Sequence, residues 1–170
     1  MIFIGLGANL PGPGLRGPRQ GCEAALRAMD GAGIRVVRRS RWYQSAPVPE
    51  SDQPWFVNGV AEVKTALDPT SLLAALHRIE ADFGRTRDTV DGPRLIDLDL
   101  LAYGAELSDG AEGLVLPHPR LHQRAFVLLP LRELAPGWRH PRLDLGVDEL
   151  IAGLPVGQRC APLDRAEPRP

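Results

Sequence analysis

Two aspartates, Asp97 and Asp99, interrupt an aliphatic stretch over residues 95–102 that follows a Gly-Pro pair. A short apolar run of this kind is typical of a buried strand. Side chains alternate across a strand, so both carboxylates are predicted to share one face, about 7 Å apart. At an effective dielectric of about 20 they would repel each other by about 2.4 kcal/mol. A shared proton, nearby arginines or a hard divalent cation would offset this repulsion, and we favour a metal site over solvated aspartates at a sheet edge.

The composition is that of one compact domain. The chain has 170 residues, 44% of them hydrophobic, and a formal net charge of −1, so no overall field selects nucleic acid or an anionic membrane. No apolar run reaches membrane-spanning length, and no basic segment typical of a signal peptide opens the chain. Cys22 and Cys160 are too few for a disulfide framework, which fits a cytoplasmic protein. We expect a single domain over residues 1–154 and a flexible tail over residues 155–170, rich in proline and charge.

The order of predicted elements indicates the fold class. Strands are expected over residues 2–6, 34–44, 55–65 and 95–102, and helices over residues 19–29 and 69–83. A hairpin of residues 106–107 with 114–116 and helices over residues 123–134 and 147–154 complete the prediction. Asp68 is a good N-cap for the second helix, with proline at its first position. The resulting βαββαβ order predicts an α+β, ferredoxin-like fold, with a mostly antiparallel sheet, helices on one face and a C-terminal extension.

Standard nucleotide and metal motifs are absent or incomplete. The segment Gly5 to Leu10 begins like a dinucleotide-binding loop but lacks its third glycine, and no Walker lysine follows. Gly5 and Gly7 are therefore interpreted as a tight exit from the first strand, where Asn9 could present an amide to a ligand. His118 and His122 have zinc-like spacing but no third ligand beside them, and His118 is expected to be exposed between two prolines. No serine or cysteine has the setting of a nucleophile.

Two groups of residues suggest ligand contacts. Phe56 and Asn58 are expected on one face of their strand, where a ring and an amide would suit a flat heterocycle, although a core phenylalanine is the simpler alternative. Several arginines flank the aspartate strand and His118, a pattern that suits a triphosphate bridged by metal. His77 and Glu80 lie one turn apart and, taken alone, fit an ordinary solvated helix surface.

These motifs together resemble the 6-hydroxymethyl-7,8-dihydropterin pyrophosphokinase family. The resemblance covers roughly residues 2 to 152, and its most specific parts are the aspartate strand and the block from His118 to Leu131. The other matching segments are Gly5 to Leu10, Ser45-Ala46-Pro47, Asp52 to Asn58, Arg78-Ile79-Glu80, Gly84-Arg85 and Leu116 to Arg120.

The resemblance implies transfer of pyrophosphate from ATP to the hydroxymethyl group of the pterin, giving AMP and the pterin diphosphate used in folate synthesis. It implies that Asp97 and Asp99 hold two Mg²⁺ ions, and that Arg85 and Arg94 join them in catalysis. The residues that it assigns to the pterin are Ser45, Phe56, Asn58 and Phe126. Those that it assigns to ATP are His77, Glu80, Arg85, Arg94, His118 and Arg124.

The sequence departs from the family in the loop over residues 85–94, which is expected to close as a lid over the triphosphate. Val90 and Asp91 stand where a base and an aromatic residue are expected, and Ala8 replaces a usual serine.

Two other functions remain open. One is a ferredoxin-like module that binds RNA or a regulatory ligand without catalysis, although the aromatic RNA-binding motif is absent. The other is a metal-dependent nucleotidyltransferase with an Asp-x-Asp strand, which would leave Phe56, Asn58 and Phe126 unexplained.

Overall fold

The computed structural model describes residues 1–84, 95–110 and 113–163, and the elements below belong to this part of the chain. In chain order they are β1 (Ile2–Ala8), α1 (Pro18–Gly31), β2 (Arg35–Arg39), β3 (Tyr43–Ser45), β4 (Phe56–Lys64), α2 (Pro69–Asp82), β5 (Asp97–Tyr103), β6 (Ser108–Asp109), β7 (Val115–Leu116), the 3₁₀ helix η2 (Leu121–Gln123), α3 (Ala125–Leu134), α4 (Val147–Ala152) and β8 (Cys160–Pro162). Within the described residues, no helix has the length and apolar character needed to cross a membrane.

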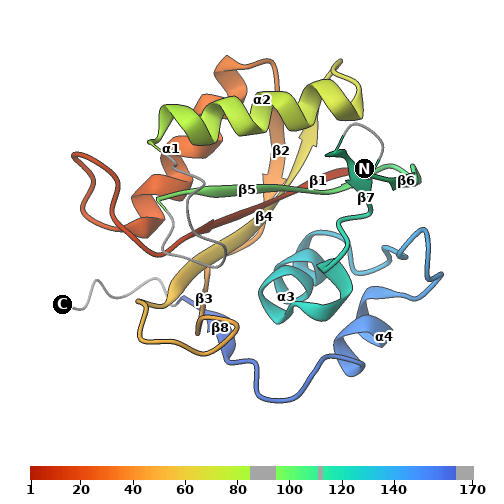
Figure 1. Ribbon diagram of the computed structural model, residues 1–170. Coiled ribbons are helices and arrows are strands. Elements are labelled where there is room, and N and C mark those ends of the chain that lie inside the picture. The colour runs from red at the N-terminus through yellow and green to blue at the C-terminus, as the bar shows by residue number, and fades with distance from the viewer. Residues whose placement is uncertain (85–94, 111–112, 164–170) are drawn as a thin grey trace.

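The main sheet has the ferredoxin-like topology that the element order predicts. Its strands lie in the order β5-β1-β4-β3-β8, and β2 pairs with β4 beside β3. All of these pairings are antiparallel. Because β1 and β2 are both antiparallel to β4, they run in the same direction and are joined through α1, which is a split βαβ unit. Figure 1 shows β5, β1 and β4 crossing the middle of the molecule as its central layer.

Helices cover both faces of this sheet, whereas the sequence predicts helices on one face. Figure 1 shows α1 and α2 on one side, and α3 and α4 on the other. The first core joins Leu6, Cys22 and Leu76, and the second joins Phe3, Leu128 and Leu150. Each side of the sheet therefore buries its own apolar cluster, because β1 sends alternate side chains to opposite faces.

The second helix forms as its sequence predicts. Asp68 accepts a hydrogen bond from the backbone N–H of Ser71 at 3.0 Å, which satisfies one of the donors that the first turn leaves without a helical partner. Leu72, Leu76 and Ile79 are buried at helical spacing. The cap and the apolar stripe thus fix both the start of α2 and the face that it presents to the sheet.

Several predicted boundaries differ from the structure because long-range contacts decide them. The single strand expected over residues 34–44 is divided into β2 and β3 at Ser40, whose hydroxyl accepts the Val60 N–H at 3.1 Å. The hairpin uses Ser108–Asp109 as its first strand in place of residues 106–107. The flexible tail expected from residue 155 contains β8, which pairs Cys160 with Ser45 on β3. The boundary of the domain near residue 154 stays a prediction.

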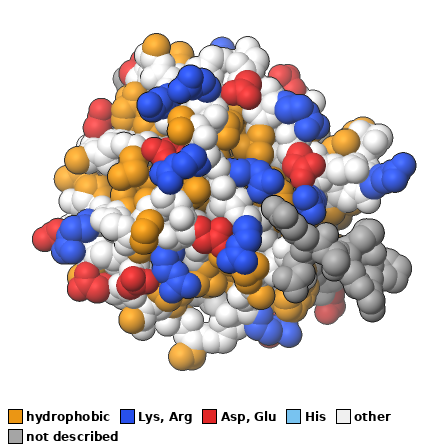
Figure 2. Space-filling view, turned by 180° about the vertical axis from the view of Figure 1, so that it is seen from behind, with side chains coloured by type: hydrophobic (Ala, Val, Ile, Leu, Met, Phe, Trp, Pro, Cys, Tyr) orange, Lys and Arg blue, Asp and Glu red, His pale blue; other side chains and the backbone are white. Residues whose placement is uncertain are grey.

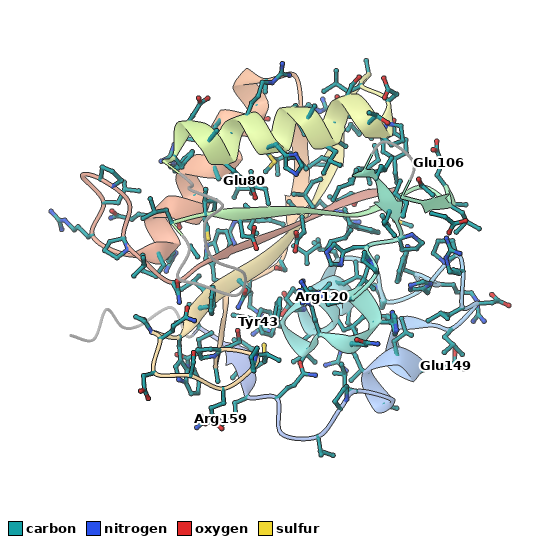
Figure 3. The ribbon with its side chains drawn as sticks, in the orientation of Figure 1. Tyr43, Glu80, Glu106, Arg120, Glu149 and Arg159 are labelled. Carbon is teal, nitrogen blue, oxygen red and sulfur yellow. The ribbon has the colours of Figure 1, made fainter. Side chains whose placement is uncertain are left out.

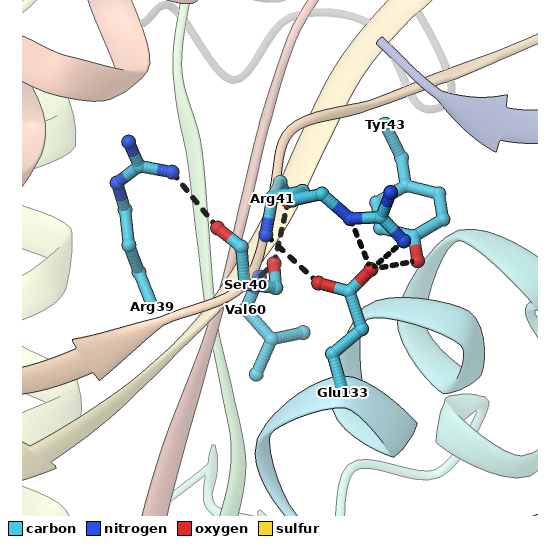
Figure 4. Close-up of polar contacts among 6 residues, drawn as sticks. All are labelled: Arg39, Ser40, Arg41, Tyr43, Val60 and Glu133. Carbon is cyan, nitrogen blue, oxygen red and sulfur yellow. Dashed lines mark hydrogen bonds and ion pairs between the residues drawn. The ribbon is translucent and has the colours of Figure 1, made fainter. Parts of the chain in front are cut away.

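Glu133 fixes α3 to β3 and to the connection between β2 and β3 (Figure 4). Its carboxylate accepts hydrogen bonds from the Arg41 backbone N–H at 2.9 Å, from Arg41 Nε at 2.8 Å and from the Tyr43 hydroxyl at 2.5 Å. Partial burial alone would raise the pKa of Glu133, but these hydrogen bonds lower that pKa below its ordinary value of 4.5. Burial and the neighbouring carboxylate raise the pKa of Tyr43 to about 12, so its hydroxyl remains a donor at neutral pH.

The lowered pKa of Glu133 predicts a pH-dependent part of the stability. The ionised carboxylate stabilises the fold above about pH 4.5, and this contribution is lost as the pH falls through the lower pKa of the folded state. We expect Glu133→Gln to lower the free energy of unfolding at pH 7 by about 1 kcal/mol, since solvent screens the pair. Urea unfolding at several pH values would measure this, with Glu23→Gln in the exposed Arg19 pair as the control. An equal loss in both variants would contradict the prediction.

Candidate active site

Every described residue of the predicted site lines one cavity of about 560 Å³. Its lining includes residues of β1, β4, β5 and α2 and of the start of α3. Figure 3 labels Glu80 between α2 and the sheet and Arg120 beside α3, and both residues line the cavity. The predicted residues brought together there are Ser45, Phe56, Asn58, His77, Glu80, Asp97, Asp99, His118, Arg124 and Phe126. Arg85 and Arg94, with the expected lid over residues 85–94, lie outside the described residues.

The two aspartates occupy one face of β5, as alternation predicts. Leu98 and Leu100 pack into the core beneath α1 and α2, whereas Leu101 belongs to the core on the α3 side. Asp97 and Asp99 therefore share the face that lines the cavity, and both side chains are half-buried. This placement brings two like charges to one wall of a partly enclosed space, where neighbouring cations are needed to offset their repulsion.

Gly5 and Gly7 form the floor of the cavity, and their interpretation as a strand exit is wrong. Both lie within β1, where Gly5 pairs with Asp99 and Gly7 pairs with Asp97 on β5. On its other side Gly7 pairs with Asn58 of β4. A Cβ atom at Gly7 would lie 3.1 Å from Asn58 Oδ1, closer than ordinary van der Waals contact. The missing side chains thus keep open the space between the carboxylates and the amide.

This close approach predicts a selective effect of Gly7→Ala. The added methyl group displaces the Asn58 amide, and we expect the affinity for a ligand bound by that amide to fall about threefold to tenfold. The backbone at Gly7 lies in an ordinary strand, so stability should change little. Calorimetric titration with the pterin would measure the loss, with Gly31→Ala as the control because its Cβ would meet nothing within 4 Å. Unchanged pterin affinity in Gly7→Ala would show that Asn58 tolerates the methyl group.

Glu80 is buried, contrary to its interpretation as a solvated helix residue. Only 1% of its surface is exposed, and its Oε1 accepts the Leu98 N–H at 2.7 Å. Leu98 stands between the two aspartates, so this contact holds the backbone of β5 where both carboxylates arise. His77, one turn earlier on α2, is half-buried and also lines the cavity.

Arg124 is a cation in direct contact with Asp99. Its Nη1 lies 3.4 Å from Asp99 Oδ2, and its guanidinium carbon lies 5.4 Å from the centre of the Phe126 ring. His118 Nε2 lies 3.9 Å from Asp99 Oδ1, too far for a hydrogen bond. Burial, with the charges of Arg124 and Arg120, lowers the pKa of His118 to about 4, so this imidazole is neutral at pH 7. His118 was expected to be exposed, but only 18% of its side chain is accessible.

The opposite end of the cavity combines aromatic rings with a fixed amide. Asn58 Nδ2 donates to Ser45 Oγ at 2.7 Å, and both residues are buried. Because the amide nitrogen is held by Ser45, the amide oxygen is the group of Asn58 that lies over Gly7. Phe56 and Phe126 come from β4 and α3 and line the same cavity. Phe56 lines it together with Asn58, as their shared strand face predicts.

The Asn9 side chain holds a loop in place, whereas the sequence suggested that its amide could contact a ligand. Its Nδ2 donates to Gln53 Oε1 at 3.2 Å and to the Pro54 carbonyl at 3.1 Å, and the residue is buried. It therefore ties the end of β1 to the loop that precedes Phe56. These two hydrogen bonds span 44 and 45 positions of the sequence, so no local pattern could have indicated them.

The donor set fits a hard cation that takes most of its ligands from elsewhere. Among the residues that the structure describes, no group of three or more His, Cys, Asp and Glu side chains could hold a metal ion. Asp97 and Asp99 supply two carboxylates on one face. Mg²⁺ is commonly held by one or two carboxylates together with substrate phosphates and water, so the pair fits Mg²⁺ bound with a nucleotide.

The comparisons of this chain with known proteins agree on one family. A family model described as 7,8-dihydro-6-hydroxymethylpterin-pyrophosphokinase (HPPK) matches residues 3–136. The 2-amino-4-hydroxy-6-hydroxymethyldihydropteridine pyrophosphokinase of Methylorubrum extorquens is 42% identical over 171 residues, covering 95% of this chain and 92% of the relative. The protein of the same name from Pseudomonas aeruginosa is 43% identical over 155 residues, covering 91% of each chain.

A solved structure supports the fold independently. The wild-type HPPK-DHPS of Plasmodium falciparum matches with a TM-score of 0.68 and 14% sequence identity. The match covers 89% of this chain and 44% of that chain, so this chain spans less than half of that protein. At this identity the likeness extends to the fold alone.

Proposed function

The chain belongs to the 7,8-dihydro-6-hydroxymethylpterin-pyrophosphokinase family, and we propose that the cavity described above carries out the reaction of that family. The protein transfers pyrophosphate from ATP to 6-hydroxymethyl-7,8-dihydropterin, giving AMP and the pterin diphosphate. The observation that carries the assignment of the site is the meeting of two aspartates with two phenylalanines and a buried amide around one cavity. One end suits phosphate and metal, and the other suits a flat heterocycle.

The pterin is bound at the end formed by Phe56, Phe126 and Asn58. Two rings from separate elements offer faces for stacking, which suits a bicyclic heterocycle. The pyrimidine edge of a pterin carries N–H donors, and the Asn58 oxygen is an acceptor fixed by the bond from its own nitrogen to Ser45. This arrangement selects a ligand by shape and by the position of its donors.

ATP is bound at the end formed by Asp97, Asp99, His118 and Arg124, with His77 and Glu80 at its border. Asp97 and Asp99 would hold two Mg²⁺ ions, which would supply positive charge to offset that of the triphosphate. Arg124 offers a guanidinium to the phosphates, and neutral His118 offers a ring N–H. Arg85 and Arg94, outside the described residues, are proposed to take further phosphate charge.

The chain's own part in the transfer is to align the reactants and exclude water. Phosphoryl transfer depends mainly on positioning and on neutralisation of charge, so no covalent nucleophile is needed. The pterin hydroxymethyl group would face the phosphate end across the floor of Gly5 and Gly7. The absence of side chains there allows the two substrates to approach each other closely.

The alternative functions receive less support. On the face shown in Figure 2, Lys and Arg side chains are interspersed with acidic and hydrophobic ones, so that face offers no continuous basic surface for RNA. A nucleotidyltransferase would use the aspartates but not the paired rings and Asn58.

Both cysteines are free thiols, which supports a cytoplasmic location.

The products of the reaction test this function. The protein is incubated with ATP, Mg²⁺ and 6-hydroxymethyl-7,8-dihydropterin, and the nucleotides are separated by ion-exchange chromatography. We expect AMP and the pterin diphosphate in equal amounts, and no AMP when the pterin is omitted. Formation of ADP, or release of pyrophosphate without a pterin product, would contradict the proposal.

A further inference from the structure

The C-terminal segment that contains β8 runs along the edge of the proposed active site. It lies beyond residues 3–136, the part that the family model matches. β8 pairs with β3, so that Cys160 stands opposite Ser45. A second cavity, of about 350 Å³, is lined on one side by Pro155 to Arg159 and on the other by Ala46, Arg124 and Phe126. Ala46, Arg124 and Phe126 also line the main cavity, so the segment adjoins the proposed active site.

Gln158 in this segment binds the first turn of α3. Its Oε1 accepts the Ala125 N–H at 2.9 Å, and its Nε2 donates to the Gln123 carbonyl at 2.8 Å. The N-cap residue of α3, Arg124, makes no capping hydrogen bond with its own side chain. The initial N–H groups of a helix have no partner within the helix, and a nearby side chain usually accepts one of them. In α3 this acceptor is Gln158, which lies 33 positions away in the sequence.

Arg159 binds the loop between β3 and β4. Its carbonyl accepts the Ala46 N–H at 3.0 Å, next to Ser45. Its guanidinium lies 3.0 Å from Glu50 Oε1 and 5.0 Å from the centre of the Trp55 ring. Consecutive residues therefore hold the β3–β4 loop and the start of α3 at a fixed separation.

We propose that Gln158 is a positioning residue for the reaction, acting through the backbone of Ala125. Ala125 stands between Arg124 and Phe126, which face the phosphate end and the pterin end of the site. Loss of the Gln158 contacts would loosen the turn that sets the direction of both side chains. This role rests on the proposed function, because it assumes that Arg124 and Phe126 contact the substrates.

Gln158→Ala in the full chain tests the proposal. We expect kcat/KM for the pterin to fall about fivefold to tenfold, the equivalent of a lost helix cap. Hydrogen exchange should become faster at the amides of residues 125–127 and stay unchanged in α1 and α2. Gln158→Glu keeps an acceptor for the Ala125 N–H and places negative charge at the start of the helix, but it loses the donor to the Gln123 carbonyl, so it should restore both properties in part.

Gln20→Ala is the matched control, because Gln20 Oε1 accepts the Arg16 N–H at 2.9 Å and neither residue lines either cavity. Its kcat/KM should equal that of the unaltered protein, and its urea midpoint should match that of Gln158→Ala. Unchanged kcat/KM in Gln158→Ala, or an equal loss of kcat/KM in Gln20→Ala at the same urea midpoint, would overturn the positioning role. Failure of the unaltered chain to form AMP would instead overturn the proposed function. The exchange rate of Ala125 in Gln158→Ala would still show whether Gln158 orders this turn.

Discussion

Replacement of Asp97 or Asp99 by asparagine is expected to lower the rate of pyrophosphate transfer by about a hundredfold to a thousandfold. Asparagine keeps the size of the side chain but removes the charge that would hold Mg²⁺ against the triphosphate. The free energy of unfolding without Mg²⁺ should change by no more than about 1 kcal/mol. Relief of the repulsion between the carboxylates offsets the partial loss of the contact between Asp99 and Arg124 at 3.4 Å.

Two measurements on each variant separate a metal site from a structural pair. Urea unfolding is followed in the presence of chelator, and AMP formation is followed over a range of Mg²⁺ concentrations. Asp148→Asn is the control, because Asp148 lies 3.6 Å from Arg132 in an ion pair of similar length that is exposed on the surface. If the aspartates were purely structural, removing one partner from a buried pair would lower stability by about 3–5 kcal/mol. A variant that unfolds easily but keeps its activity per folded molecule would refute the metal site.

Phe126→Ala is expected to raise the dissociation constant of the pterin by about tenfold to a hundredfold, the range that stacking on an aromatic side chain provides. The dissociation constant of ATP should change much less. Phe126 is half-buried and lies at the start of α3, so its removal leaves the buried residues of that helix in place. Calorimetric titration with each substrate would measure both constants.

Phe56→Ala provides the second half of this experiment, because Phe56 approaches the same cavity from β4. Both variants should lose pterin affinity while keeping the far-ultraviolet spectrum and urea midpoint of the unaltered protein. Equal losses of pterin and ATP affinity would indicate a general disturbance of the fold. A loss confined to one variant would mean that a single ring, and not a pair, contacts the heterocycle.

Local patterns determined the features that depend on neighbouring residues alone. The alternation of leucines and aspartates over residues 95–102 set which face of β5 carries the carboxylates, because side chains of a strand alternate whatever surrounds it. Asp68 and the stripe after it set the start and the buried face of α2. The order of strands and helices, with short connections, left few topologies open, and the ferredoxin-like one is confirmed.

Only the tertiary structure decided the features that depend on residues distant in the chain. Glu80 has the sequence context of a surface residue but is buried because the Leu98 N–H lies within its reach. The roles of Gly5 and Gly7 follow from strand pairing, which places them beside Asp97, Asp99 and Asn58. Pro155 to Pro162 have a tail-like composition, yet β3 offers an edge for β8 and α3 offers an N–H for Gln158. Periodicity reports which face of an element is buried, whereas its partners are set by pairing between segments that the sequence keeps far apart.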